Sequence, residues 1–175
     1  LSGGSLIVGT DAYASGGILH LSGTGALTIN GTLTLGYNSS IAWGQAGGSG
    51  EVNQTGGSAT INTLTLTYGN LSTGKYFLRG GILNVGMVSK GNNAGIPNYG
   101  LFYFDGGILR ASRTNTTNFI NNGLDLLVGY GGAIIDTNGY DINLPFLRSD
   151  DPTRDGGLTK QGTGTLIISD ADSTY

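Results

Sequence analysis

The stretch RGGILNVG, Arg79 to Gly86, carries the pattern that decides the fold. After its two glycines and Ile82, the apolar residues Leu83 and Val85 alternate with the polar Asn84 and the small Gly86. Such alternation predicts a β-strand with one face buried and the other exposed. The same arrangement recurs as SGGILHL at residues 15–21 and as DGGILRA at residues 105–111. We therefore expect equivalent strands to recur along the chain.

The Gly-Gly pairs mark a repeat. They begin at residues 3, 16, 47, 56, 80, 106, 131 and 156, and the last five lie 24, 26, 25 and 25 residues apart. A strand set repeated every ~20–50 residues is typical of a solenoid, in which equivalent strands stack. The sequence therefore predicts an all-β fold, a parallel β-helix of about seven coils of roughly 25 residues. We expect residues 1–175 to form a single β-solenoid domain.

The repeat also predicts which side chains face the core. Aligning the residues after each Gly-Gly pair puts mostly apolar residues at the second and fourth positions and mostly polar ones at the third. A slip of one residue would exchange the two faces, so the assignment is specific. The positions predicted to be buried are Leu19, Leu21, Ile61, Leu83, Val85, Leu109 and Ile134. Those predicted to be exposed are His20, Thr60, Arg110 and Lys160.

The composition supports an ordered β-protein and excludes several classes of function. Glycine accounts for 34 of the 175 residues without a collagen period, and only 11% of residues are charged. The net charge of −3 and the scattered cationic residues argue against nucleic acid as a partner. The absence of cysteine excludes disulfides and thiol chemistry. No apolar run is long enough for a membrane-spanning helix, and we expect no cofactor.

The segment GGLTKQGTGTLIISDADSTY, residues 156–175, resembles the autotransporter-associated β-strand repeat. That family reads roughly Gly-Gly-Leu-x-Lys-x-Gly-x-Gly-x-Leu-x-Leu, followed by a short polar turn that ends in Asn-x-Tyr. The matching residues are Gly156, Gly157, Leu158, Lys160, Gly162, Gly164, Leu166 and Tyr175. The departure is DADSTY, where the family tends to have Asn. The resemblance implies a right-handed β-helix that is secreted and displayed at the outer membrane surface of a bacterium.

We expect the chain to be a segment of a larger surface protein. A solenoid leaves unpaired backbone groups and an open apolar cross-section at each end unless a cap covers them. The expected partners are therefore further coils of the same polypeptide, or identical subunits stacked end to end into a filament. Glycans are a further candidate partner.

The sequence contains few candidate catalytic residues. His20 is the single histidine, and its place on the polar side of a strand predicts a surface residue. Asp150, Asp151 and Asp155 form the densest acidic group, but Asp-Pro is a common turn former and no calcium-loop spacing is present. We therefore predict a solvated turn, no metal site and no enzyme. A carbohydrate-cleaving β-helix stays open, and a groove with three or more convergent charged side chains would favour it.

The aromatic segment YGLFYF, residues 99–104, is the candidate binding element. Alternation puts Leu101 and Tyr103 on one face of the strand, and Phe102 and Phe104 on the other. A stacked core is the favoured interpretation. The alternative is an exposed aromatic shelf that could stack on sugars or on another chain. We take Phe102, Tyr103 and Phe104 as the candidate binding residues of that shelf.

Taken together, these features predict an extracellular structural or adhesive β-solenoid module, such as a stalk, a spacer or a fibre subunit. The alternative is a carbohydrate-binding or carbohydrate-cleaving β-helix.

Overall fold

The computed structural model describes residues 2–10, 16–39, 47–91, 97–169 and 173–174. All regular structure in these ranges is β, and no helix occurs among them. The strands, in chain order, are β1 (Ser2–Gly3), β2 (Leu6–Val8), β3 (Gly16–Leu21), β4 (Ala26–Tyr37), β5 (Ser49–Tyr68), β6 (Thr73–Lys90), β7 (Tyr99–Phe104), β8 (Ile108–Ala111), β9 (Asp125–Val128), β10 (Ala133–Asp136), β11 (Ile142–Leu144), β12 (Arg148–Ser149), β13 (Leu158–Gln161) and β14 (Leu166–Ile168).

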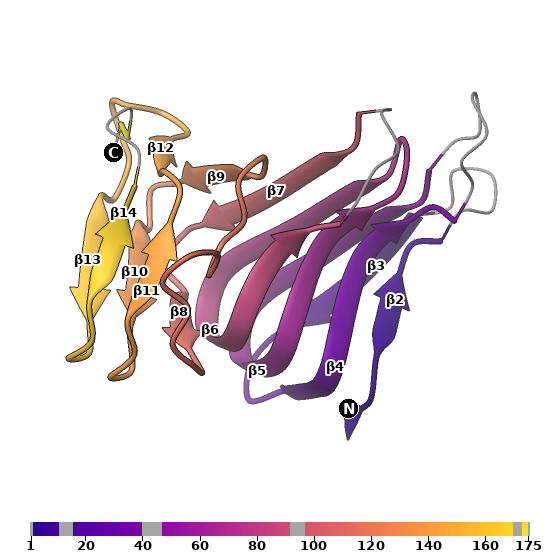
Figure 1. The fold of residues 1–175 in the computed structure, drawn as a ribbon, viewed down its shortest axis with the longest axis horizontal. Helices are drawn as coiled ribbons and strands as arrows, with labels where there is room; N and C mark the ends of the chain where they lie inside the picture. Colours follow the sequence, from indigo (N-terminus) through magenta and orange to yellow (C-terminus); the bar gives the residue numbers. More distant parts are fainter. Residues whose placement is uncertain (1, 11–15, 40–46, 92–96, 170–172, 175) are drawn as a thin grey trace.

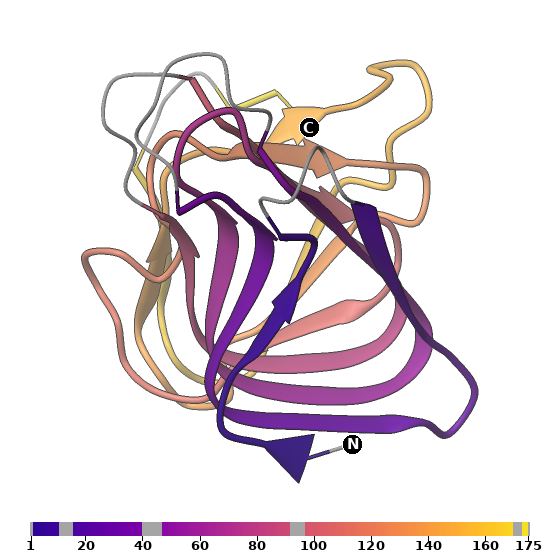
Figure 2. The ribbon, with the colours of Figure 1, turned by 90° about the vertical axis from the view of Figure 1, so that its right-hand side faces the viewer.

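The strands stack in parallel into a β-solenoid of about six turns, which agrees with the predicted repeat (Figure 1). Inner strands hydrogen-bond to their equivalents in the coils before and after them, as in the series β4, β5, β6. Viewed along the stack, the coils lie one behind another (Figure 2). β2 and β13 lie toward opposite ends of the rod.

The near copies in the sequence become neighbouring strands. Thr28 pairs with Thr60 and Ile29 with Ile61, and Leu33 lies beside Leu64 after a register shift. The same side chains therefore stack on themselves from coil to coil. In a parallel ladder this keeps these inward positions apolar over several coils.

The Gly-Gly pairs form corners of the coils. Gly81 has a φ of 71°, which L-residues rarely adopt, and a Cβ there would collide with the Gly57 carbonyl oxygen of the preceding coil. Gly132 has a φ of 78°, but at the pair 106–107 it is the first glycine, Gly106, that has the positive φ of 97°. The corner therefore does not fall at the same member of every pair.

One predicted core position is wrong, because the corner is longer in this coil: three residues separate Phe104 from Ile108, and five separate their partners Val128 and Ile134. Counting from the Gly-Gly pairs aligns Ile134 with Leu109, but Ile134 pairs with Ile108, and Ile135 pairs with Leu109. Ile135 is consequently buried, and Ile134 faces outward and is half-buried. The slip of one residue exchanges the two faces in this coil.

The other predicted core positions agree with the structure, with one partial exception. Leu19 is only half-buried, because β3 pairs with β5 alone among the described strands. The predicted positions that are buried are Leu21, Ile61, Leu83, Val85 and Leu109.

His20, Thr60 and Lys160 are exposed as predicted, whereas Arg110 is half-buried. The Arg110 Nε donates to Asp136 Oδ2 at 2.7 Å, which draws the guanidinium onto the surface of the coil. Lys160 is exposed although it pairs with the buried Ile135, so it occupies an inward column of the last described coil. Its ammonium donates to the Gly162 carbonyl oxygen at 2.7 Å.

A polar pair interrupts the apolar core. The Tyr76 hydroxyl donates to Gln54 Oε1 at 2.6 Å, and both side chains are fully buried. The Gln54 amide in turn donates to the Ile82 carbonyl oxygen at 3.1 Å. Burial raises the pKa of Tyr76 far above its usual value, so the phenol stays protonated and keeps this bond.

Candidate ligand-binding site

The aromatic segment on β7 divides between the core and the surface. Phe102 and Phe104 are fully buried, with ring centroids 4.6 Å apart, and Phe102 also stacks on Tyr76 at 5.4 Å. They cannot present an aromatic shelf to a ligand, so the prediction of Phe102 and Phe104 as surface binding residues is wrong. The stacked-core interpretation holds for these two residues. Tyr103 points the other way and is half-buried on the outer face.

Tyr103 belongs to an outward column of side chains that crosses the coils. His20 pairs with Asn53, Asn53 with Phe77, and Phe77 with Tyr103. The rings of Phe77 and Tyr103 lie 5.7 Å apart at a tilt of 53°. His20 therefore lies on the same outer face as the aromatic residues, three coils away from Tyr103.

Arg79 covers this aromatic pair. Its guanidinium carbon lies 4.4 Å from the Phe77 ring centroid and 5.8 Å from that of Tyr103, both within cation–π range. The guanidinium also donates to Asn53 Oδ1 at 2.5 Å and lies 3.8 Å from Asp105 Oδ2. Arg79 is thus engaged on the outer face, and Phe77 lies under it rather than open to a ligand.

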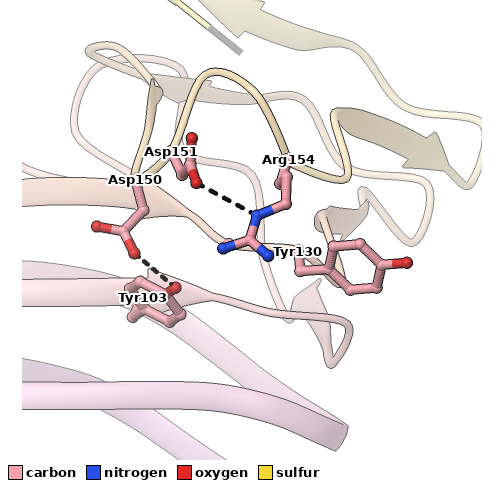
Figure 3. Close-up of a pocket in the computed structure, with 6 residues that line it drawn as sticks. Tyr103, Tyr130, Asp150, Asp151 and Arg154 are labelled. Carbon is pink, nitrogen blue, oxygen red and sulfur yellow. Dashed lines mark hydrogen bonds and ion pairs between the residues drawn. The ribbon is translucent and has the colours of Figure 1, made fainter.

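A hollow of about 260 Å³ opens on the C-terminal side of Tyr103 (Figure 3). Its lining comes from three successive coils. β7 contributes Tyr103, the corner after β9 contributes a glycine and a tyrosine, and the loop after β12 contributes charged residues. The lining residues are Tyr103, Gly129, Tyr130, Asp150, Asp151 and Arg154.

Hydrogen bonds tie the hollow together. The Tyr103 hydroxyl donates to Asp150 Oδ2 at 2.9 Å, across 47 residues of sequence. Arg154 Nε lies 3.4 Å from Asp151 Oδ2, and Thr153 donates to Asp151 Oδ1 from both its backbone nitrogen and its hydroxyl. The loop from Asp150 to Arg154 is therefore a hydrogen-bonded turn, as predicted for the Asp-Pro segment.

Gly129 leaves room for the Tyr103 phenol. A Cβ at Gly129 would lie 2.5 Å from the Tyr103 hydroxyl oxygen and 2.8 Å from the ring. The Gly129 backbone nitrogen donates to the Phe104 carbonyl oxygen at 2.8 Å, which fixes this corner against β7. A side chain at position 129 would push the phenol out of the hollow.

The environment shifts the pKa of two lining residues in opposite directions. Burial raises the pKa of Tyr103 to about 12, and the hydrogen bond to Asp150 adds to this. The hydrogen bonds from Thr153, with a smaller contribution from Arg154, lower the pKa of Asp151. At neutral pH the hollow therefore holds a protonated phenol beside an ionised Asp151.

Three charged side chains, Asp150, Asp151 and Arg154, do converge on this hollow. That arrangement is the one expected to favour a carbohydrate-cleaving β-helix. However, a glycosidase needs a carboxylic acid whose pKa is raised so that it can protonate the leaving group. Asp151 has the opposite shift and is paired with Arg154. The lowered pKa makes Asp151 unsuited to protonate a leaving group.

The sequence did not point to Tyr130, Gly129 or Arg154 as lining residues. A usable signal was present in GYGG at residues 129–132, where a lone aromatic residue stands among corner glycines. A corner places its side chains outside the strand ladder, and Tyr130 is 82% exposed. Asp155, the third member of the acidic group, accepts a hydrogen bond from the Gly157 backbone nitrogen at 2.9 Å and lies outside the hollow lining.

The segment that resembles the autotransporter-associated repeat forms the last described coil. Gly162 has a φ of 76°, and a Cβ at Gly164 would collide with the Tyr140 carbonyl oxygen. Leu158 and Leu166 are half-buried and pack against the core. Tyr175 lies outside the described residues. The remaining motif glycines, Gly156 and Gly157, form the corner before β13.

Within the described ranges, no group of three or more His, Cys, Asp or Glu side chains could hold a metal ion. The described part of the chain also contains no helix long and apolar enough to cross a membrane. No protein-family model, curated protein or solved structure matches the chain.

Proposed function

We propose that this chain is an extracellular structural or adhesive β-solenoid module without catalytic activity. It serves as a stalk, spacer or fibre subunit at a bacterial cell surface. The observation that supports this most is the continuous apolar interior, which stacks coil on coil and leaves the outer faces for contact. Such a rod is stabilised by contacts between neighbouring coils and extends in one direction.

The resemblance of residues 156–175 to the autotransporter-associated repeat supports the surface location. In the structure this segment follows the same course as the coil before it, since β13 pairs with β10 and β14 with β11. It is thus compatible with a repeat that can be added many times to one rod.

The proposed partners are further coils of the same polypeptide or identical subunits stacked end to end. Among the described strands β13 pairs with β10 alone, so its other edge has free backbone donors and acceptors. Leu158 and Leu166 are half-buried beside this edge. A further coil would bury both side chains and pair the edge.

A carbohydrate-binding surface is the second candidate function, and the hollow beside Tyr103 favours it. A carbohydrate-cleaving β-helix has weaker support, because Asp151 is ionised and paired with Arg154.

Immunogold labelling tests the main proposal. Antibodies raised against the 175-residue chain should label intact, non-permeabilised cells of the source organism. Labelling that requires permeabilisation would contradict an extracellular module. Sedimentation equilibrium of the purified chain tests the stacking of identical subunits, which predicts a mass that rises with protein concentration. A constant monomer mass would leave further coils of the same polypeptide as the proposed partner.

A further inference from the structure

The hollow beside Tyr103 combines three kinds of ligand-binding group. Tyr130 offers an aromatic ring at the rim, Asp150 and Asp151 offer carboxylate oxygens, and Arg154 offers guanidinium nitrogens. Figure 3 shows the Arg154 guanidinium between Tyr103 and Tyr130, with its terminal nitrogens directed into the space between them.

Tyr130 is the most exposed large hydrophobic side chain among the described residues, at 82%. A tyrosine held at a glycine corner gains little from packing against its own chain. The corner is nevertheless well fixed, because the Gly129 carbonyl oxygen accepts hydrogen bonds from the backbone nitrogens of Gly132 and Gly156, at 3.1 and 3.0 Å. The ring is therefore positioned but open, which is the state that suits stacking on a ligand.

The polar groups of the hollow keep spare hydrogen-bonding capacity. Arg154 uses Nε toward Asp151, and its two terminal nitrogens have no partner among the described residues. The Asp150 carboxylate accepts the Tyr103 hydroxyl at one oxygen and can accept further donors, since a carboxylate has about four lone-pair sites. A ligand here would need groups that both donate and accept hydrogen bonds.

Sugar hydroxyls meet this requirement, because each can donate to a carboxylate and accept from a guanidinium. The C–H face of a sugar ring is apolar enough to lie against the Tyr130 ring. Two carboxylates against one guanidinium disfavour an acidic sugar, since like charges repel at short range. The volume of about 260 Å³ lies just below the roughly 300–1,000 Å³ of sites for drug-sized ligands. One sugar unit of a longer chain is thus the expected occupant.

We propose that the hollow formed by Tyr103, Tyr130, Asp150, Asp151 and Arg154 binds one unit of a neutral polysaccharide. Tyr130 stacks on the sugar ring, Asp150 accepts its hydroxyl groups, and Arg154 donates to its oxygens. Tyr103 and Gly129 act as positioning residues, since they hold Asp150 and shape the floor. This inference deepens the proposed adhesive function by naming the ligand class.

Affinity electrophoresis of the full 175-residue chain tests the proposal. Native gels would contain dextran, galactomannan or xyloglucan as neutral probes, and polygalacturonate as the acidic probe. We expect at least one neutral polysaccharide to retard the chain and polygalacturonate not to do so. Tyr130→Ala and Asp150→Asn should each weaken the retardation by about tenfold in Kd or more, or abolish it.

Tyr68→Ala is the matched control, because Tyr68 is an exposed tyrosine that does not line the hollow. It should bind as the unmodified chain does. Circular dichroism must show that each variant keeps its β-structure. Both tested side chains lie at the surface, so folding should persist; Asn at position 150 can still accept the Tyr103 hydroxyl.

Three results would overturn the proposal: no retardation by any of the three neutral polysaccharides, retardation unchanged in both variants, or stronger retardation by polygalacturonate. Labelling of intact cells together with any of these results would leave the extracellular module standing and remove only the sugar site. Specific retardation without surface labelling would support the sugar site and contradict the extracellular module.

Discussion

The central and C-terminal coils of this solenoid share the same stacked columns but differ in the continuity of their strands. β5 and β6 run for 20 and 18 residues through bends without leaving the ladder. β10 and β13 have 4 residues each, and β14 has 3. The difference separates two roles, since continuous strands build a closed core and interrupted ones leave loops that can form a site.

The sequence explains this contrast. TINTLTLTYGN at residues 60–70 has one extra polar residue between Ile61 and Leu64, with alternation on either side of it, and its backbone stays in the ladder. The segment SDDPTRD at residues 149–155 contains side chains that bond to their own backbone, and a proline that cannot donate. Asp151 accordingly accepts from the Thr153 nitrogen, and the chain leaves the ladder to line the hollow.

The largest expected effect is the loss of a central aromatic residue. Phe102→Ala removes a fully buried ring that contacts Tyr76 and Phe104, and it should lower the free energy of unfolding by ~3–5 kcal/mol. Leu166→Ala, in the last described coil, should cost less than ~2 kcal/mol because the side chain is only half-buried there. Chemical denaturation measures both. Equal losses would remove the distinction between the central and C-terminal coils.

Corner glycines should show the same contrast. Gly81→Ala combines a positive φ with a collision against Gly57, and it should cost roughly 2–5 kcal/mol. Gly157→Ala meets no described atom within 4 Å and should cost only the conformational strain, ~1–2 kcal/mol. Denaturation midpoints of the two variants measure this difference. A reversed order would show that the corners do not stack as closely as described.

The buried polar pair should be of intermediate importance. Tyr76→Phe removes the donor to Gln54 and leaves a buried amide oxygen without its partner, so it should cost ~1–3 kcal/mol. Tyr68→Phe alters an exposed tyrosine and should change the stability by less than ~0.5 kcal/mol. An unchanged midpoint for Tyr76→Phe would indicate that Gln54 finds another donor in the core.

The smallest effect concerns the alkaline titration of Tyr103. Its pKa of about 12 lies above the ordinary value of 10.0, so the folded state favours the protonated phenol. The resulting stabilisation is complete below pH ~10 and is lost as the pH rises through ~12. The absorbance at 295 nm of the unmodified chain minus that of Tyr103→Phe should follow this titration.

Asp150→Asn provides the control for that titration. It keeps an acceptor for the phenol but removes the negative charge, so the Tyr103 transition should move to lower pH. A transition at the same pH in both proteins would show that burial alone sets the pKa. Because Asp150 also lines the hollow, the same variant connects the titration to the binding test.

The sequence by itself determined the parallel solenoid, its repeat and most of its inward columns. Alternation and glycine corners act locally, so Leu83, Leu109 and Ile61 could be assigned to the core without knowing their neighbours. Only the tertiary structure decided the register at Ile134, because the corner between Val128 and Ile134 is two residues longer than the paired corner between Phe104 and Ile108, and the Gly-Gly spacing does not reveal this. It also decided that Phe102 and Phe104 face the core while Tyr103 faces outward. The hollow required the stacking of three coils, since Tyr103 and Asp150 are 47 residues apart and meet only across strands.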